Sequence, residues 1–291
     1  MGAREHRTGP RIRSMSSADP FDLKLAARLT PVVVEVPHAG LEVPAALKGP
    51  LVATPRDLRA DADLFVDRIY QGAPGRGAPL LCARVSRYVC DLNREPDDVD
   101  ARAVEGHSDP RPDSPRGFVW RLTTDGKPAL ARPLTRKEWQ KRVDDVWASY
   151  HGVLEGLVAE AQAMCGHAIL LSGHSMPSVG RALHADSGRP RADIVVGWRG
   201  GESCAPRVKD LCVEHFRARG YSVAVDDPYR GGATTIRYGK PGEGVHAVQI
   251  EMSRALYMDE QAHAPREQGL SRVRADADAL VDALAALDLG R

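Results

Sequence analysis

The stretch AILLSGHSMP (168–177) decides the fold, because an apolar run here leads directly into a histidine. Two further stretches share this design, PVVVEVPHAG (31–40) and VHAVQIEMSR (245–254). Short apolar runs that end at turn residues are typical of buried strands. Ligand sites in open α/β sheets lie beyond the carboxyl ends of the strands. The sequence therefore predicts that three reactive side chains converge at one edge of a sheet. They are His38, His174 and Glu251.

Helical patterns alternate with these strands. Thr135 and Glu138 fit a capping box, and apolar residues follow them at helical spacing. A second helix is expected over 206–219, ending before Gly220, and a third over 265–289. Strands are also expected over 79–90, as a strand or hairpin arm, and over 221–225.

This alternation predicts an α/β fold with a mixed, largely parallel sheet flanked by helices. We expect one domain over residues 26–291, preceded by a disordered arm over residues 1–25, within which Met15 is an alternative start. The Pro/Gly/Asp-rich stretch from Glu95 to Pro115 predicts a long loop that contributes little to the core.

Composition excludes several classes of protein. Forty Lys and Arg residues against 39 Asp and Glu residues leave no basic excess for nucleic-acid binding. No apolar run approaches the roughly 20 residues that span a bilayer, and the N-terminus lacks the apolar segment of a secretory signal. Five cysteines without a CxxC pair are typical of buried thiols in a reducing compartment. We therefore expect a cytoplasmic protein.

Two histidines at strand ends indicate a metal site. A catalytic zinc has three protein ligands and one open position for water, so a third ligand is needed, and a carboxylate suits it. Asp61 and Asp63 have an alternative role, because aspartate caps helices well and both precede the helical pattern 64–70. Spacing leaves five carboxylates open: Glu35, Glu42, Asp61, Asp63 and Asp67.

Two stretches offer arginine to an anion. Asn93 and Arg94 follow the strand pattern of 79–90, and an arginine beside an amide can bind a carboxylate in a bidentate fork. The stretch YRGGATT (229–235) lacks the lysine and the spacing of a phosphate loop, which excludes ATP and NAD binding by this motif. It leaves Arg230 available to an anion.

A serine hydrolase is the alternative. The stretch GHSMP (173–177) matches a nucleophile elbow except that Pro177 replaces the final glycine. In that reading Ser175 is the nucleophile, and His246 or His263 is its base.

Seven separated segments resemble the N-formylglutamate amidohydrolase family, in the family's order and over roughly residues 30 to 260. They are VPHAG (36–40), DADLFVDRIY (61–70), SRYVCDLNREPDD (86–98), LLSGHSMP (170–177), ADIVVGWRGGESCAP (192–206), PYRGG (228–232) and GVHAVQIEMSRALYM (244–258).

The resemblance implies hydrolysis of N-formyl-L-glutamate to formate and L-glutamate, a terminal step of histidine degradation. It also implies a fold like that of zinc carboxypeptidases and zinc N-acetylmuramoyl amidases, and a divalent metal, zinc by preference. Carried over, the metal ligands are His38, Asp63 and His174, the general base is Glu251, and the carboxylate-binding pair is Asn93 and Arg94. Arg181 and Arg230 are further candidates for holding the substrate carboxylates.

Two departures from the family pattern bear on the substrate. Leu64-Phe65 stands where members often carry Trp-His, and ATTIRYG (233–239) lacks a histidine found in many of them. We expect both departures to lie at the substrate pocket, which leaves a related N-acyl amino acid as an alternative substrate. A cell-wall zinc amidase is a further alternative, although the chain shows no export signal or wall-binding repeat.

Overall fold

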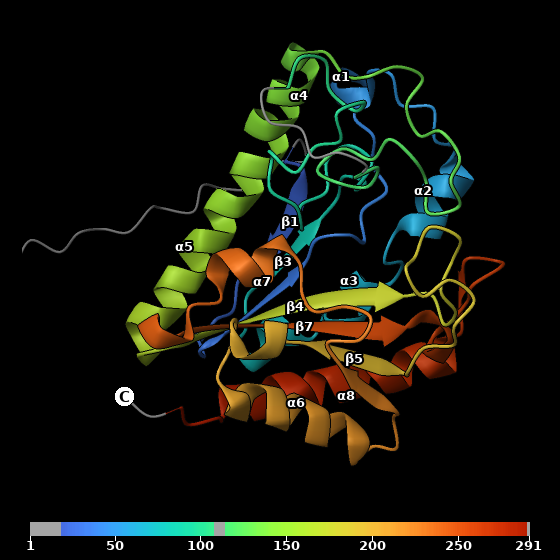
Figure 1. Ribbon diagram of the computed structural model, residues 1–291. Coiled ribbons are helices and arrows are strands. Elements are labelled where there is room, and N and C mark those ends of the chain that lie inside the picture. Colours follow the sequence, from blue (N-terminus) through green and yellow to red (C-terminus); the bar gives the residue numbers. More distant parts are fainter. Residues whose placement is uncertain (1–18, 108–113, 290–291) are drawn as a thin grey trace, which may run out of the picture.

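The computed structural model describes residues 19–107 and 114–289 (Figure 1). A seven-stranded sheet forms its centre, with the strand order β1-β3-β2-β4-β7-β5-β6. Four neighbouring pairs are parallel, and β1–β3 and β5–β7 are antiparallel. The strands are β1 (Phe21–Lys24), β2 (Val32–Val36), β3 (Leu80–Ala83), β4 (Ala168–Met176), β5 (Ile194–Gly197), β6 (Val223–Val225) and β7 (Val245–Ser253). A separate hairpin pairs β8 (Met258–Asp259) with β9 (Ala264–Pro265). The predicted single-domain mixed α/β architecture is confirmed.

Helices cover both faces of the sheet (Figure 1). They are α1 (Ala45–Lys48), α2 (Pro55–Asp61), α3 (Val66–Ile69), α4 (Arg136–Arg142), α5 (Ala148–Cys165), α6 (Pro206–Arg217), α7 (Ala233–Tyr238) and α8 (Glu267–Ala285). Side chains of α3, α6 and α8 pack in one apolar cluster with Val34 and Ile250, whereas α5 packs in a second cluster with Val33 and Leu170. Alternate residues of β2 thus face the two cores, as the twofold repeat of a strand requires.

The predicted capping box at Thr135 is confirmed. The hydroxyl of Thr135 accepts the Glu138 amide at 3.2 Å, and the Glu138 carboxylate accepts the Thr135 amide at 2.8 Å. A short π-helical segment, Val143–Trp147, joins α4 to α5, so the helix continues to Cys165.

The strand predicted over 79–90 is confirmed only for Leu80–Ala83. After Ala83, two backbone amides donate to nearby side chains and not to a neighbouring strand: the Tyr88 amide donates to Ser86 Oγ, and the Asn93 amide donates to Asp91 Oδ1. Such local bonds favour turns over a sheet ladder. They fold residues 86–93 back toward the sheet edge.

Two other expectations need correction. Residues 1–18 of the predicted arm lie outside the described residues, but Phe21–Lys24 form β1, because the buried Phe21 ring packs edge-on against Tyr150.

The stretch from 95 to 115 lacks regular helices and strands in its described part, yet Val99, Ala103 and Val104 are fully buried. The Leu134 amide donates to the Ala103 carbonyl and the Phe118 amide donates to the Asp98 carbonyl, which draws the loop into the second core.

Among the described residues, no helix is both long and apolar enough to cross a membrane.

The turn after β2 depends on Gly40. A Cβ atom at this position would lie 2.4 Å from the carbonyl of Arg84, which is itself bonded to the Glu42 amide. We expect Gly40→Ala to lower the free energy of unfolding by about 1–3 kcal/mol or more, because backbone and not a flexible side chain must move. Urea denaturation measures this change.

Gly152→Ala is the matched control. Gly152 lies inside α5 with no atom within 4 Å of the added Cβ, so this substitution should stabilise the chain by about 0.5–1 kcal/mol. Equal effects of the two substitutions would contradict the close approach at Gly40.

Candidate active site and metal centre

A cavity of about 700 Å³ lies beyond the carboxyl ends of β2, β4 and β7. All eight site residues expected from the sequence line it: His38, Asp63, Asn93, Arg94, His174, Arg181, Arg230 and Glu251. His174 and Glu251 lie within their strands and not after them, because β4 continues to Met176 and β7 to Ser253.

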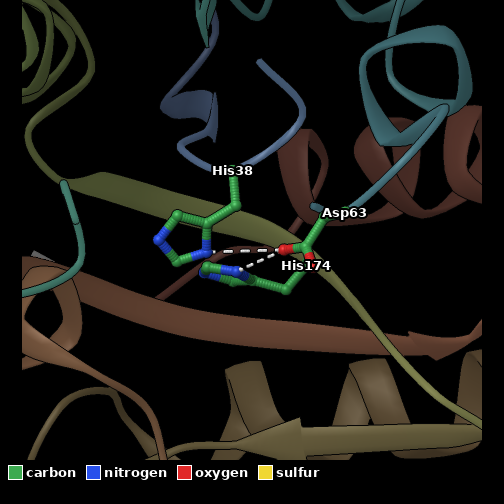
Figure 2. Close-up of side chains that lie close together, drawn as sticks. All are labelled: His38, Asp63 and His174. Atoms are coloured by element: carbon green, nitrogen blue, oxygen red, sulfur yellow. Dashed lines mark hydrogen bonds and ion pairs between the residues drawn. The ribbon is translucent and has the colours of Figure 1, made fainter. Parts of the chain in front are cut away.

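Three of these lining side chains, His38, Asp63 and His174, lie close together (Figure 2). His174 Nδ1 lies 3.0 Å from Asp63 Oδ2, and His38 Nδ1 lies 3.5 Å from the same oxygen. All three side chains are buried, and one ligand atom from each lies within 4.8 Å of the others. They come from the turn after β2, the segment between α2 and α3, and β4.

The donor set fits a divalent metal. His38 Nδ1 is buried and has no hydrogen-bond partner among the described residues, a state that is rare for a buried polar atom. It faces a second imidazole nitrogen and a carboxylate oxygen, which are the ligand types that zinc takes.

Each histidine uses its other ring nitrogen elsewhere. His38 Nε2 lies 2.7 Å from Asp91 Oδ1, and His174 Nε2 lies 3.0 Å from Ser172 Oγ. The Ser172 hydroxyl donates in turn to Glu35 at 2.8 Å. At His174 Nε2 the side-chain amide of Asn93 also lies 3.3 Å away. With both Nε2 atoms hydrogen-bonded, both Nδ1 atoms face Asp63, the arrangement common around metal-binding histidines.

Asp91 is fixed by four donors. Besides His38 it accepts hydrogen bonds from the guanidinium of Arg87, from Trp120 Nε1 and from the Asn93 amide. Burial alone would raise the pKa of Asp91, but Arg87 and His38 hold it well below its usual value. This carboxylate therefore stays charged and holds the His38 ring in place.

The backbone and Arg254 position Asp63. Its amide donates to the His38 carbonyl at 2.9 Å, which joins the two ligand segments. Its second oxygen, Oδ1, accepts from Arg254 at 3.2 Å, so Oδ2 is left to face the histidines. Burial would raise the pKa of Asp63, whereas His174 and His38 hold it well below its usual value.

The other four carboxylates that the spacing left open are directed elsewhere. Glu35 accepts from Tyr150 and Ser172, Glu42 from Arg84, and Asp61 from Tyr88 and Arg181, while Asp67 is exposed on α3. The helix-capping role considered for Asp61 and Asp63 is wrong. Asp61 is the last residue of α2, and the N-cap of α3 is Phe65, with no side-chain bond.

Glu251 lies beside this group. It is the register partner of His174 in the parallel β4–β7 pair, and its Oε1 accepts the Gln249 amide at 2.9 Å. Burial raises the pKa of Glu251, although the neighbouring His174 opposes the shift. A buried carboxyl with a raised pKa is well suited to exchange protons near neutral pH.

The four residues expected to bind substrate differ in how they are bonded. Asn93 is built into the framework, because its carbonyl accepts both the amide and the hydroxyl of Thr234. Arg181 already binds Asp61 and Asp125. Arg94 is 46% exposed and lies 3.5 Å from Asp98. The exposed guanidinium of Arg230 has no bonded partner in the described part of the chain.

The sequence did not identify several cavity residues: Arg87, Asp91, Arg116, Trp120, Gln249 and Arg254. Asp91 had a signal, since it precedes Asn93 in the stretch DLNR, whereas the others resemble ordinary surface or core residues when read singly.

The departures from the family pattern do not lie in the cavity wall, contrary to expectation. Leu64 and Phe65 pack in the core, and Ile236 and Arg237, which stand where many members carry the histidine, lie on α7 with Ile236 59% exposed. Neither pair is among the lining residues of this cavity.

Ser175 does not have the surroundings of a nucleophile. It lies inside β4, not on a sharp turn, and its hydroxyl accepts from Arg254 at 3.2 Å. His246 lies at the opposite end of β7, where it pairs with Ile169, and its Nδ1 accepts the Ala205 amide. No histidine of the described residues bonds to Ser175.

The family model for N-formylglutamate amidohydrolase matches residues 30–258. An N-formylglutamate deformylase from Pseudomonas aeruginosa is 33% identical over 238 residues, covering 80% of this chain and 84% of the relative. One from Pseudomonas putida is 31% identical over 236 residues, covering 79% and 82%.

Among solved structures, the crystal structure of N-formylglutamate amidohydrolase from Ralstonia eutropha JMP134 superposes with a TM-score of 0.81 at 33% identity. The alignment covers 91% of this chain and 97% of that one. On these matches the chain belongs to the N-formylglutamate amidohydrolase family.

Proposed function

We propose that this chain hydrolyses the amide bond of N-formyl-L-glutamate, giving formate and L-glutamate, with a divalent metal, zinc by preference, at His38, Asp63 and His174. The observation that carries the proposal is the buried Nδ1 of His38, which has no hydrogen-bond partner among the described residues and faces Asp63 and His174 beside Glu251. The activity of the relatives supports the substrate. Formate and glutamate are the products expected at the end of histidine degradation.

The chemistry divides between the metal and the protein. A divalent metal held by His38, Asp63 and His174 would polarise the amide carbonyl and lower the pKa of a nearby water molecule. Glu251 takes a proton from a water molecule as the oxygen of that water bonds to the formyl carbon. It returns the proton to the glutamate nitrogen as the C–N bond breaks, so the leaving group departs as an amine.

The remaining residues hold the reactants. Asp91 and Ser172 fix the two imidazole rings, and Arg254 fixes Asp63. Asn93 and Arg94 stay predictions as substrate ligands, together with Arg181 and Arg230. Of these four side chains, Arg94 and Arg230 make the fewest bonds to the protein: Arg94 has one long contact with Asp98, and Arg230 has none within the described residues.

Metal removal tests the proposal. Dialysis against a chelator should abolish hydrolysis of N-formyl-L-glutamate and lower the melting temperature, because three buried polar ligands lose their shared partner. Added zinc should restore both, measured by formate release and thermal unfolding. Full turnover by a preparation shown to be metal-free would contradict the metal.

Glu251→Gln separates the base from the ligands. The amide keeps the size and the hydrogen bond to Gln249 but cannot accept the proton from water. Turnover should fall by roughly 10²–10⁴-fold, while metal content measured by elemental analysis stays that of the wild type. Loss of the metal together with activity would place Glu251 among the ligands instead.

Ser172 and Ser175 provide a matched pair on one strand. Ser172→Ala removes the acceptor at His174 Nε2 and should weaken metal affinity by roughly 10–100-fold, measured with a competing chelator. Ser175→Ala should retain metal affinity and turnover close to those of the wild type. An inactive Ser175→Ala beside an active His38→Ala would favour the serine hydrolase.

A further inference from the structure

Six arginines line the cavity, and four of them are neutralised by protein carboxylates. Arg87 binds Asp91 at 2.7 Å, and Arg254 binds Asp63 at 3.2 Å. The other two neutralised pairs are Arg181 with Asp61 and Asp125, and Arg94 with Asp98. Arg87 and Arg254 therefore hold Asp91 and Asp63 in position, whereas Arg181 and Arg94 form part of the cavity wall.

Arg116 and Arg230 are different. Within the described ranges, neither guanidinium has a carboxylate within salt-bridge distance. Arg116 is half-buried, donates only to the Leu183 carbonyl at 2.5 Å, and lies 5.8 Å from the centre of the Trp120 ring. Burial lowers the pKa of Arg116, and the positive charges of Arg87 and Arg94 lower it further. A charged group in such surroundings is costly unless an anion joins it.

Both arginines stand on anchored loops. Residues 115 and 116 are tied to the chain that follows, since the Arg121 amide donates to the Pro115 carbonyl at 2.8 Å. On the other loop, the Arg230 carbonyl accepts the Arg199 amide, and the Gly232 amide donates to Gln249 on β7. These bonds fix the backbone that carries the two cations before any substrate enters, which lowers the entropy cost of binding.

We propose that Arg116 and Arg230 each bind one carboxylate of the substrate, so that the cavity selects N-acyl amino acids with two carboxylates. The inference rests on the proposed function and adds Arg116, which no sequence motif singled out. Glutamate carries its two carboxylates on opposite ends of a three-carbon chain, so two separate cations are needed to hold both. A monocarboxylic N-formyl amino acid would leave one guanidinium unpaired in the cavity, and that loss disfavours its binding.

The test compares three ligands: N-formyl-L-glutamate, its γ-amide N-formyl-L-glutamine, and the corresponding α-amide. Arg116→Gln and Arg230→Gln should each lower kcat/KM for N-formyl-L-glutamate by roughly 10–100-fold, the effect of losing a hydrogen bond to a charged group. Each penalty should nearly vanish for one of the two amides, and the two variants should respond to different amides. Arg189→Gln is the control for net charge, because Arg189 pairs with Asp227 on the surface and does not line the cavity.

Calorimetric titration of the same ligands in the Glu251→Gln background gives a measurement that needs no turnover. If Arg116→Gln weakens the binding of N-formyl-L-glutamate but hardly changes the binding of one amide, the pairing of arginine with carboxylate is supported. Should the wild type then hydrolyse nothing, only the proposed function fails. Equal penalties on all three ligands, or none, would overturn the pairing while normal wild-type turnover leaves the proposed function standing. Melting curves of each variant show that the fold is retained.

Discussion

β4 and β7 run parallel and in register from Ala168 opposite Val245 to Met176 opposite Ser253, and this pairing sets His174 beside Glu251. Side chains alternate along a strand, so a slip of one residue would turn one of the two into the opposite core. The same alternation places Ser172 and Gln249 one step behind them on the same face. The positions of Glu251, the proposed general base, and of the residues that support it are therefore consequences of a single strand register, which the apolar residues of the other face enforce.

Besides the strand register, the site depends on hydrogen-bond partners for the polar groups buried at the sheet edge. Glu35, Ser172 and Tyr150 satisfy one another beneath His174, and Asp91 collects its donors beneath His38. These contacts leave two ring nitrogens and one carboxylate oxygen facing the cavity. A divalent cation is the group that best satisfies all three. Burial lowers the pKa of His174, but the hydrogen bond to Asp63 and the charge of Glu251 raise it by more, so the net shift is upward.

Local patterns were enough to predict strands over 31–36, 168–172 and 245–252 and the three reactive residues in or directly after them, because apolar runs and turn residues are visible within ten positions. They did not show that β4 and β7 continue past His174 and Glu251, to Met176 and Ser253. They could not choose Asp63 from its four competitors, since that choice depends on the bond between its amide and the His38 carbonyl. The family resemblance made that choice. The sequence also could not predict the contacts of Arg116, Trp120 and Arg254, because these contacts form only when loops distant in sequence pack together.

We propose that His38, Asp63 and His174 hold a metal while Glu251 remains free of it. Anomalous diffraction at the zinc edge, from crystals grown with zinc, tests this most directly. We expect one strong peak about 2.0–2.2 Å from His38 Nδ1, His174 Nδ1 and an oxygen of Asp63, with the Glu251 carboxylate outside bonding distance. A peak bonded to Glu251, or no peak among these three side chains, would contradict it.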